Sequence, residues 1–120
     1  MDKTAKILLI EDEVITAMSL IMDLKINGFK NSKFVSTGSK AAVSAKEQMP
    51  DIIIADVSLS GGESGIDVAA VISGETGIPI IITSGYEVEE LSSRMSILNN
   101  AHFLRKPVVV ATLIKLIERI

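Results

Sequence analysis

The sequence predicts an α/β fold built on a doubly wound, five-stranded parallel sheet. Short apolar runs alternate with helix-like segments along the whole chain, as they do in βαβ units. Three of the runs, at 6–10, 51–56 and 79–83, are almost unbroken apolar, which is typical of strands buried on both faces of a parallel sheet. We therefore expect these three strands at the centre of the sheet.

The two remaining strands are expected at the edges. The segment 32–36 has polar residues at its ends, and 101–105 is similarly weak, so neither has the pattern of a strand covered on both faces. Right-handed crossovers favour a reversal of strand order between the first and third strands, which opens a crevice at their carboxyl ends. Ligands of such sheets bind in this crevice.

Helices are expected between the strands. The first shows apolar residues at helical spacing, namely Val14, Ala17, Met18, Ile21 and Leu24, and the pair Asn27-Gly28 supplies a stop. Helical patterns also cover 38–48, 64–73, 87–98 and 108–120. The last of these has a second apolar stripe, formed by Val109, Leu116 and Ile120, beyond the face that must cover the sheet.

Length and composition limit the possible functions. A chain of 120 residues is expected to form one domain, 1–120, and no apolar run approaches the roughly 20 residues of a membrane helix. The net charge of −3 predicts no direct contact with nucleic acid. The absence of cysteine rules out disulfides, and we see no secretion signal, so a cytoplasmic location is expected.

Charged residues follow three of the predicted strands. Glu11 and Asp12 follow the first strand, Asp56 closes the third, and Lys106 follows the fifth. Because the carboxyl ends of parallel strands meet at one edge of the sheet, these side chains should converge. Neighbouring carboxylates raise one another's pKa unless a cation neutralises them, and Mg²⁺ is the natural oxygen-bound partner. The pattern predicts a combined cation and phosphate site.

The same pattern assigns a chemistry to this site. A metal-neutralised aspartate can attack phosphorus and form an aspartyl phosphate, and Asp56 is the candidate nucleophile. Lys106 and Thr83 would supply positive charge and a hydrogen-bond donor where the phosphoryl group arrives. Ser84-Gly85, directly after Thr83, are small enough for the backbone to approach an anion.

Taken together, these residues resemble the receiver domains of two-component response regulators, which include the chemotaxis response regulator. The resemblance spans essentially the whole chain and rests on four motifs in order: the acidic pair, the aspartate, the threonine and Lys106-Pro107. It implies a flavodoxin-like (βα)5 fold with strand order 2-1-3-4-5. Because that order is the family's own, the topology is not predicted independently of the resemblance.

The resemblance also implies roles for individual residues. Asp56 matches the phosphoacceptor, which takes a phosphoryl group from a histidine kinase or a phosphotransfer protein. Asp12 matches a direct Mg²⁺ ligand, Glu11 an acid that acts through a metal-bound water, and Ser58 the residue whose backbone carbonyl is the third protein ligand. These assignments make the chain a signalling module and not an enzyme that turns over free substrate.

A second group of residues is implied to switch the domain. Lys106 looks like the lysine that pairs with the phosphoryl group, Thr83 like the hydroxyl that moves to bond it, and Phe103 like the aromatic that packs inward when the threonine moves. A cis Lys106–Pro107 bond is implied as well. The helix at 87–98, the strand at 101–105 and the last helix would then bind an output partner or a second copy.

Departures from the family pattern concern the loops and the switch. The loop 58–65 lacks the usual proline and is about one residue longer, so we expect it to be mobile, with Gly61-Gly62 and Gly65 forming a flexible turn. Phe103 replaces the tyrosine of the chemotaxis protein, so packing alone would report the switch. Ser58 and Gly85 are small residues that flank the phosphoryl group and influence its lifetime.

Other interpretations stay open at this point. Asp56 could serve a phosphohydrolase, although such enzymes want a second acid two residues on, where this chain has Ser58. A third possibility is a receiver that serves only as a docking module. His102 is interpreted as structural, Tyr86 as a loop cap or a recognition residue, and the second stripe of the last helix as a partner surface or a frayed end. The sequence fits both a stand-alone regulator and part of a longer protein.

Overall fold

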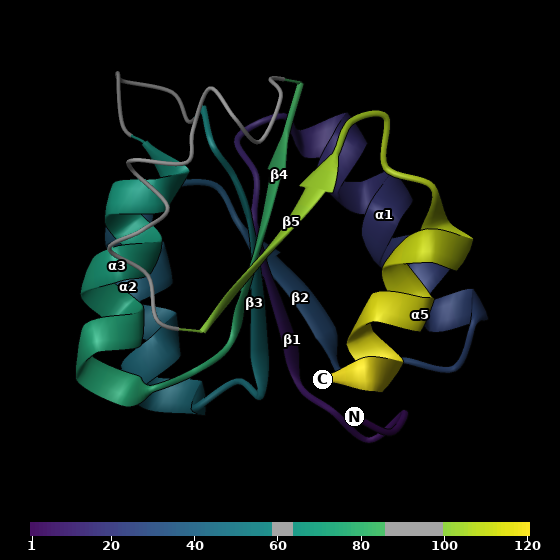
Figure 1. Cartoon of the computed structure of the whole chain (residues 1–120), viewed down its shortest axis with the longest axis horizontal. Coiled ribbons are helices and arrows are strands. Elements are labelled where there is room, and N and C mark those ends of the chain that lie inside the picture. Colours follow the sequence, from purple (N-terminus) through teal and green to yellow (C-terminus); the bar gives the residue numbers. More distant parts are fainter. Residues whose placement is uncertain (59–63, 86–99) are drawn as a thin grey trace.

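The computed structural model describes residues 1–58, 64–85 and 100–120. The described residues form a parallel sheet with strand order β2-β1-β3-β4-β5 (Figure 1), which confirms the predicted fold class and topology. The helices and strands, in order, are β1 (Ile7–Ile10), α1 (Val14–Ile26), β2 (Ser32–Val35), α2 (Gly38–Gln48), β3 (Ile52–Asp56), α3 (Gly65–Thr76), β4 (Ile80–Ser84), β5 (Ala101–Arg105) and α5 (Val110–Arg119). The helix predicted at 87–98 and Tyr86 lie outside the described residues.

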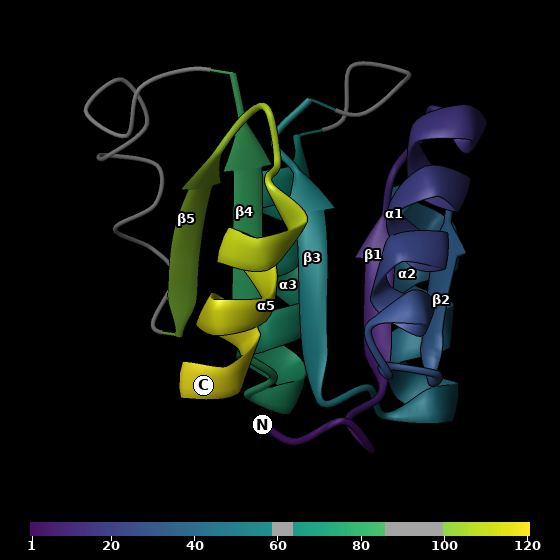
Figure 2. The same cartoon turned by 90° about the vertical axis from the view of Figure 1, so that its right-hand side faces the viewer.

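Helices cover both faces of the sheet. Figure 1 shows α2 and α3 on one face and α1 and α5 on the other, and Figure 2 looks onto the α1 and α5 side. Successive residues of β1 point to opposite faces, so Leu8 and Ile10 join the core under α2 and α3 while Ile7 and Leu9 join the core under α1 and α5. This double burial explains why the central strands are apolar at almost every position.

The helix ends follow from their capping residues. Thr37 caps α2 by accepting a hydrogen bond from the Lys40 N–H, and α2 ends at Met49, whose φ of 46° is left-handed. The third helix runs to Thr76 and not to 73, because Gly77, with φ of 73°, is the left-handed residue that ends it. In the part of the chain that the structure describes, no helix is both long and apolar enough to cross a membrane.

The predicted second stripe of α5 is wrong for two of its three residues. Leu116 and Ile120 are half-buried and pack against the core under α1 and α5, and only Val109 is more than half exposed. The N-terminal segment contributes to this packing, since Met1 contacts the same core and its ammonium group donates to the carbonyl of Ile117 (3.1 Å). The stripe therefore stabilises the fold.

The outward side of α1 is unexpectedly apolar. Of the five residues that predicted this helix, Ala17, Ile21 and Leu24 are buried, as expected for its sheet-facing side, whereas Val14 and Met18 are more than half exposed. Further exposed apolar side chains on this helix are Ile15, Met22 and Ile26. The helix therefore carries apolar residues well beyond its sheet-facing side.

Candidate functional site

The ends of four strands bring the predicted site residues to one edge of the sheet. Asp56 is the last residue of β3 and lies opposite Thr83 of β4 in the strand register. Glu11 directly follows β1, and its N–H donates to the carbonyl of Val35 (3.0 Å). Lys106 directly follows β5, where its N–H donates to the carbonyl of Ser84 (2.7 Å). Backbone hydrogen bonds and the strand register thus fix the positions from which these side chains extend.

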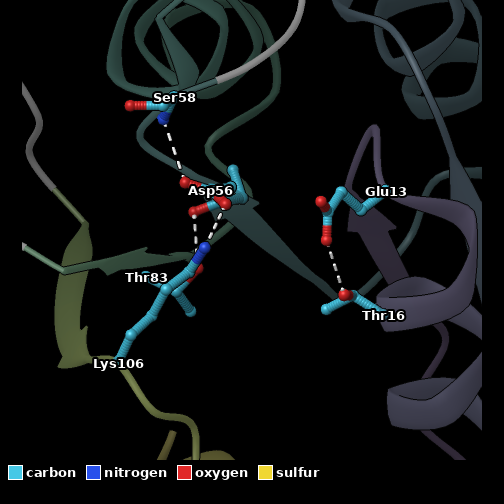
Figure 3. A network of polar contacts seen from close by, with 7 residues as sticks. Glu13, Thr16, Asp56, Ser58, Thr83 and Lys106 are labelled. Carbon is cyan, nitrogen blue, oxygen red and sulfur yellow. Dashed lines mark hydrogen bonds and ion pairs between the residues drawn. The ribbon is translucent and has the colours of Figure 1, made fainter.

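The carboxylate of Asp56 is buried, and both of its oxygens have a partner. Oδ2 forms an ion pair with the ammonium of Lys106, and Oδ1 accepts a hydrogen bond from the backbone N–H of Ser58 (2.9 Å), as Figure 3 shows. Burial alone would lower the pKa of Lys106. The hydrogen bond and charge of Asp56, with further help from Glu11 and Glu13, outweigh burial and raise it. Lys106 is therefore held in its charged form beside Asp56.

The carboxylate of Glu11 lies in an unfavourable environment for a negative charge. Its side chain is buried, and its Oε2 has no hydrogen-bond partner among the described residues. Burial and the negative charge of Asp56 raise the pKa of Glu11 to about 7, with a smaller contribution from Asp12 and opposition from Lys106. A buried carboxylate oxygen without a donor requires either a proton or a cation.

The donor groups fit a hard divalent cation, although they do not form a finished metal cluster. The negative charges of Asp56 and Asp12 both act on the carboxylate of Glu11. Across residues 1–58, 64–85 and 100–120, however, no three potential ligands are grouped as a metal site. The unsatisfied oxygen of Glu11 and the surrounding carboxylates suit Mg²⁺, which binds few protein oxygens and keeps several waters. The predicted ligand set thus stays a prediction.

The predicted switch residues lie on the two neighbouring strands. Thr83 is buried, and its hydroxyl donates to the carbonyl of Ala55 at 3.5 Å. Phe103 of β5 is half-buried and packs against the core under α2 and α3. The Lys106–Pro107 bond is cis, as the resemblance implied. His102, next to Phe103, is half-buried within β5 and pairs in register with Ile81.

An open pocket of about 780 Å³ contains the site and continues between α1 and α5. Glu11, Asp56, Thr83 and Lys106 line it, together with polar and apolar side chains of α1 and with residues 107–110 at the start of α5. Glu13 and Thr16 also line it and are joined by a hydrogen bond of 3.0 Å (Figure 3), a pair that the sequence reasoning missed. The available signal was Glu13 itself, the third acid after the first strand.

The connection from β3 to α3 is more ordered at its ends than the sequence predicted. Residues 59–63 lie outside the described part, but Ser58 and Ser64 form an antiparallel bridge across it. The interpretation of Gly65 as part of a flexible turn is wrong. Gly65 is the first residue of α3, and its N–H donates to the carbonyl of Val57 (2.8 Å).

Comparison with known proteins identifies the family. Residues 7–118 match the family described as "Response regulator receiver domain". The chain belongs to this family. The receiver domain is therefore a module of two-component signal transduction, and the family resemblance drawn from the sequence is confirmed.

Curated relatives of this receiver domain include a transcriptional regulatory protein and a DNA-binding response regulator. It is 28% identical over 113 residues to the transcriptional regulatory protein PdtaR of Mycobacterium tuberculosis. The aligned residues cover 94% of this chain and 55% of that protein. It is 32% identical over 77 residues to the DNA-binding response regulator MtrA of Mycolicibacterium smegmatis, covering 64% and 33%. The chain thus spans between a third and about half the length of these relatives.

Solved structures support the same assignment. The receiver domain is similar to a response regulator receiver protein from Sinorhizobium medicae, with a TM-score of 0.83, 28% identity, and coverage of 97% of this chain and 93% of the other. Receiver domains are signalling modules that work with histidine kinases and output domains, and they are not enzymes of the ordinary kind.

Proposed function

We propose that Asp56 accepts a phosphoryl group from the phosphohistidine of a histidine kinase or a phosphotransfer protein. The observation that carries this proposal is a buried carboxylate at the end of a central strand, held by the Lys106 ammonium inside an open pocket. An oxygen of Asp56 would attack phosphorus as the P–N bond to the imidazole breaks. The electron pair of that bond returns to the imidazole of the donor, and the aspartyl phosphate forms.

Lys106 and Thr83 supply the electrostatic part of the proposed reaction. The Lys106 ammonium lies against Oδ2 of Asp56, where it can stabilise negative charge on an incoming phosphoryl group. Thr83 is opposite Asp56 in the register, so rotation of its side chain away from the Ala55 carbonyl would bring a hydroxyl donor to the phosphoryl oxygens. Phe103 on the neighbouring strand would then repack, and this movement is the proposed output.

Mg²⁺ is the cofactor that the donor groups suit. We assign its binding to the carboxylates of Glu11, Asp12 and Asp56 and to the backbone carbonyl of Ser58, with Glu11 acting through a metal-bound water. When bound, the ion neutralises carboxylate charge and so favours the approach of a phosphoryl group. Because a metal competes with the proton on Glu11, binding should weaken as the pH falls below about 7.

The phosphorylated domain would act by changing its affinity for partners in the cytoplasm. We propose the surface formed by the segment before β5, by β5 and by α5 as the place where an output partner or a second copy binds. Of the α5 stripe, Val109 is the residue left for this contact, since Leu116 and Ile120 serve the core. We propose no direct contact between residues 1–120 and DNA, in keeping with the net charge of −3.

Intact-mass spectrometry tests the acceptor assignment. The chain is incubated with Mg²⁺ and acetyl phosphate, and one phosphoryl adduct is expected on the parent and none on Asp56→Asn. Asp51→Asn, at the exposed position just before the same strand, is the matched control and should be labelled like the parent. An adduct of equal yield on Asp56→Asn would refute the acceptor. Continued release of phosphate from simple esters, beyond one equivalent, would instead support a phosphohydrolase.

A further inference from the structure

The first residue of α3 lies directly on the backbone of Asp56. A Cβ placed on Gly65 would be 1.7 Å from the carbonyl oxygen of Asp56 and 2.6 Å from its carbonyl carbon. It would also be 3.2 Å from the Cα of Val57. All three are main-chain atoms of a buried strand end, so they cannot yield as the tip of a flexible side chain could. No side chain of any size fits at this position.

Short polar contacts connect this packing to the acceptor carboxylate. The Gly65 N–H donates to the carbonyl of Val57 (2.8 Å), and Ser64 pairs with Ser58 across the connection. The N–H of Ser58 in turn donates to Oδ1 of Asp56 (2.9 Å). The start of α3 therefore holds the segment that carries the hydrogen-bond donor of the carboxylate.

We infer that Gly65 is a positioning residue for phosphoryl acceptance, because its missing side chain lets α3 pack on the Asp56 backbone and keep the Ser58 amide on Oδ1. With Oδ1 held in this way, Oδ2 faces Lys106. The requirement is one of space, since Gly65, unlike Gly28 and Gly77, does not have a positive φ. The link to phosphorylation rests on the function proposed above.

A second glycine in α3 provides a matched control. Gly74 lies in the same helix, and a Cβ added there would meet nothing within 4 Å. Alanine has a higher helix propensity than glycine, so Gly74→Ala should keep or increase stability. The same substitution at two positions of one helix thus separates the effect of contact with Asp56 from that of helix propensity.

The experiment compares Gly65→Ala with Gly74→Ala in two measurements on the full chain. The first is the initial rate of adduct formation with acetyl phosphate and Mg²⁺, measured well below the unfolding midpoint. A displacement of about 1 Å can cost on the order of a hundredfold in rate, so we expect a loss of about tenfold or more for Gly65→Ala. The second is the Ser58 amide resonance in ¹H–¹⁵N spectra, which should move in Gly65→Ala alone.

A milder pair of variants serves if Gly65→Ala does not fold. The Ser64 hydroxyl accepts a hydrogen bond from the Ile66 N–H (3.2 Å) at the start of α3, and Thr37 accepts one from the Lys40 N–H (3.1 Å) at the start of α2. Ser64→Ala and Thr37→Ala should therefore lose similar unfolding free energy. Only Ser64→Ala should slow labelling, by a few-fold, and shift the Ser58 amide.

The outcomes distinguish this inference from the proposed function. Labelling of Gly65→Ala at the parent rate with an unmoved Ser58 amide would overturn the inference. If that variant does not fold, equal labelling and equal amide shifts in Ser64→Ala and Thr37→Ala would overturn it too. A parent chain that gains no adduct on Asp56 would refute the proposed function, and the Ser58 amide would still decide whether Gly65 positions the carboxylate.

Discussion

Protonation of the Glu11 carboxyl group is coupled to folding. Burial and the charge of Asp56 raise its pKa from the ordinary value of 4.5 to about 7, so the folded state binds a proton more tightly than the unfolded chain. The stability that this proton provides is fully present below pH 4.5 and is lost as the pH rises through about 7. Above that range, the folded state holds a buried charge without a donor on Oε2.

The first prediction concerns Glu11→Gln, which keeps the shape of the side chain and removes the charge. Without Mg²⁺, this variant should be more stable than the parent at pH 8, by on the order of 1–3 kcal/mol, and the difference should shrink toward pH 5. Urea unfolding at a series of pH values measures it. Glu47→Gln, at an exposed position of α2, should follow the parent throughout. Parallel curves for parent and Glu11→Gln would contradict the raised pKa.

The second prediction concerns Mg²⁺. An ion that binds only the folded state stabilises it by RT ln(1 + [Mg²⁺]/Kd), about 1.4 kcal/mol at ten times Kd. This gain should be present in the parent at pH 8 and decrease at pH 6, because the proton on Glu11 opposes the ion. Asp12→Asn should lose most of the gain, whereas Glu47→Gln should keep it. An equal Mg²⁺ effect in Asp12→Asn and the parent would remove Asp12 from the ligand set.

At the scale of single residues, the sequence located charged groups well and packing contacts poorly. Glu11, Asp56 and Lys106 could be predicted because their strands are parallel and end at one edge. The absence of any space beside Gly65 could not, because it depends on how α3 approaches Asp56 in three dimensions. The partnership of Glu13 with Thr16 required knowing the orientation of the first turn of α1.

Helix ends provide the clearest test at the scale of elements. Met49 ends α2 with φ of 46°, a conformation that costs a residue with a side chain roughly 1–2 kcal/mol. Gly77 ends α3 with φ of 73°, where glycine has no such cost. Two helices thus end in the same way, one with the favoured residue and one without it.

The third prediction is that Met49→Gly stabilises the domain, by about 0.5–1 kcal/mol after allowing for the greater flexibility of glycine in the unfolded chain. Gly77→Ala should destabilise it by about 1 kcal/mol, since alanine is strained in the left-handed region. Thermal and urea unfolding measure both. Gly74→Ala, at the open helical position, should not destabilise. Destabilisation by Met49→Gly would show that the exposed Met49 side chain matters more than its backbone.

Element boundaries also show where sequence reasoning stopped being sufficient. All five strands were predicted to within about two residues. The three central ones were clear because strands buried on both faces of a parallel sheet are almost entirely apolar. The end of α3 was placed too early, because Gly74 and Gly77 look alike in sequence and only one adopts a positive φ. The outer stripe of α5 was misjudged because the N-terminal segment packs there, a contact between chain regions far apart in sequence.

The whole molecule depends on two separate apolar layers. Ile72 of α3 belongs to the core on one face of the sheet, and Ile117 of α5 to the core on the other. Both side chains are buried, yet they belong to different clusters and face the sheet from opposite sides. Their contributions to stability should therefore be independent, while unfolding of either layer exposes the shared strands.

The fourth prediction is that Ile72→Val and Ile117→Val each cost about 0.5–1.5 kcal/mol of unfolding free energy. The double variant should lose the sum to within about 0.5 kcal/mol, because the two residues share no partners. A single urea transition should be retained in all three. Separate transitions, or a double variant with the same unfolding free energy as one of the single variants, would contradict this description of two independent layers on one sheet. The same substitution at both positions makes each variant the control for the other.

Both chain ends lie at the pole of the domain opposite the strand tips that carry Asp56 and Lys106 (Figure 1). A bead, a fluorophore or another protein joined at either end would therefore hang from the far pole and leave the mouth of the pocket facing open solution. An immobilised chain should still meet its phosphodonor unhindered. A conformational change caused by phosphorylation would have to extend along the full length of the strands to reach a protein attached at either end.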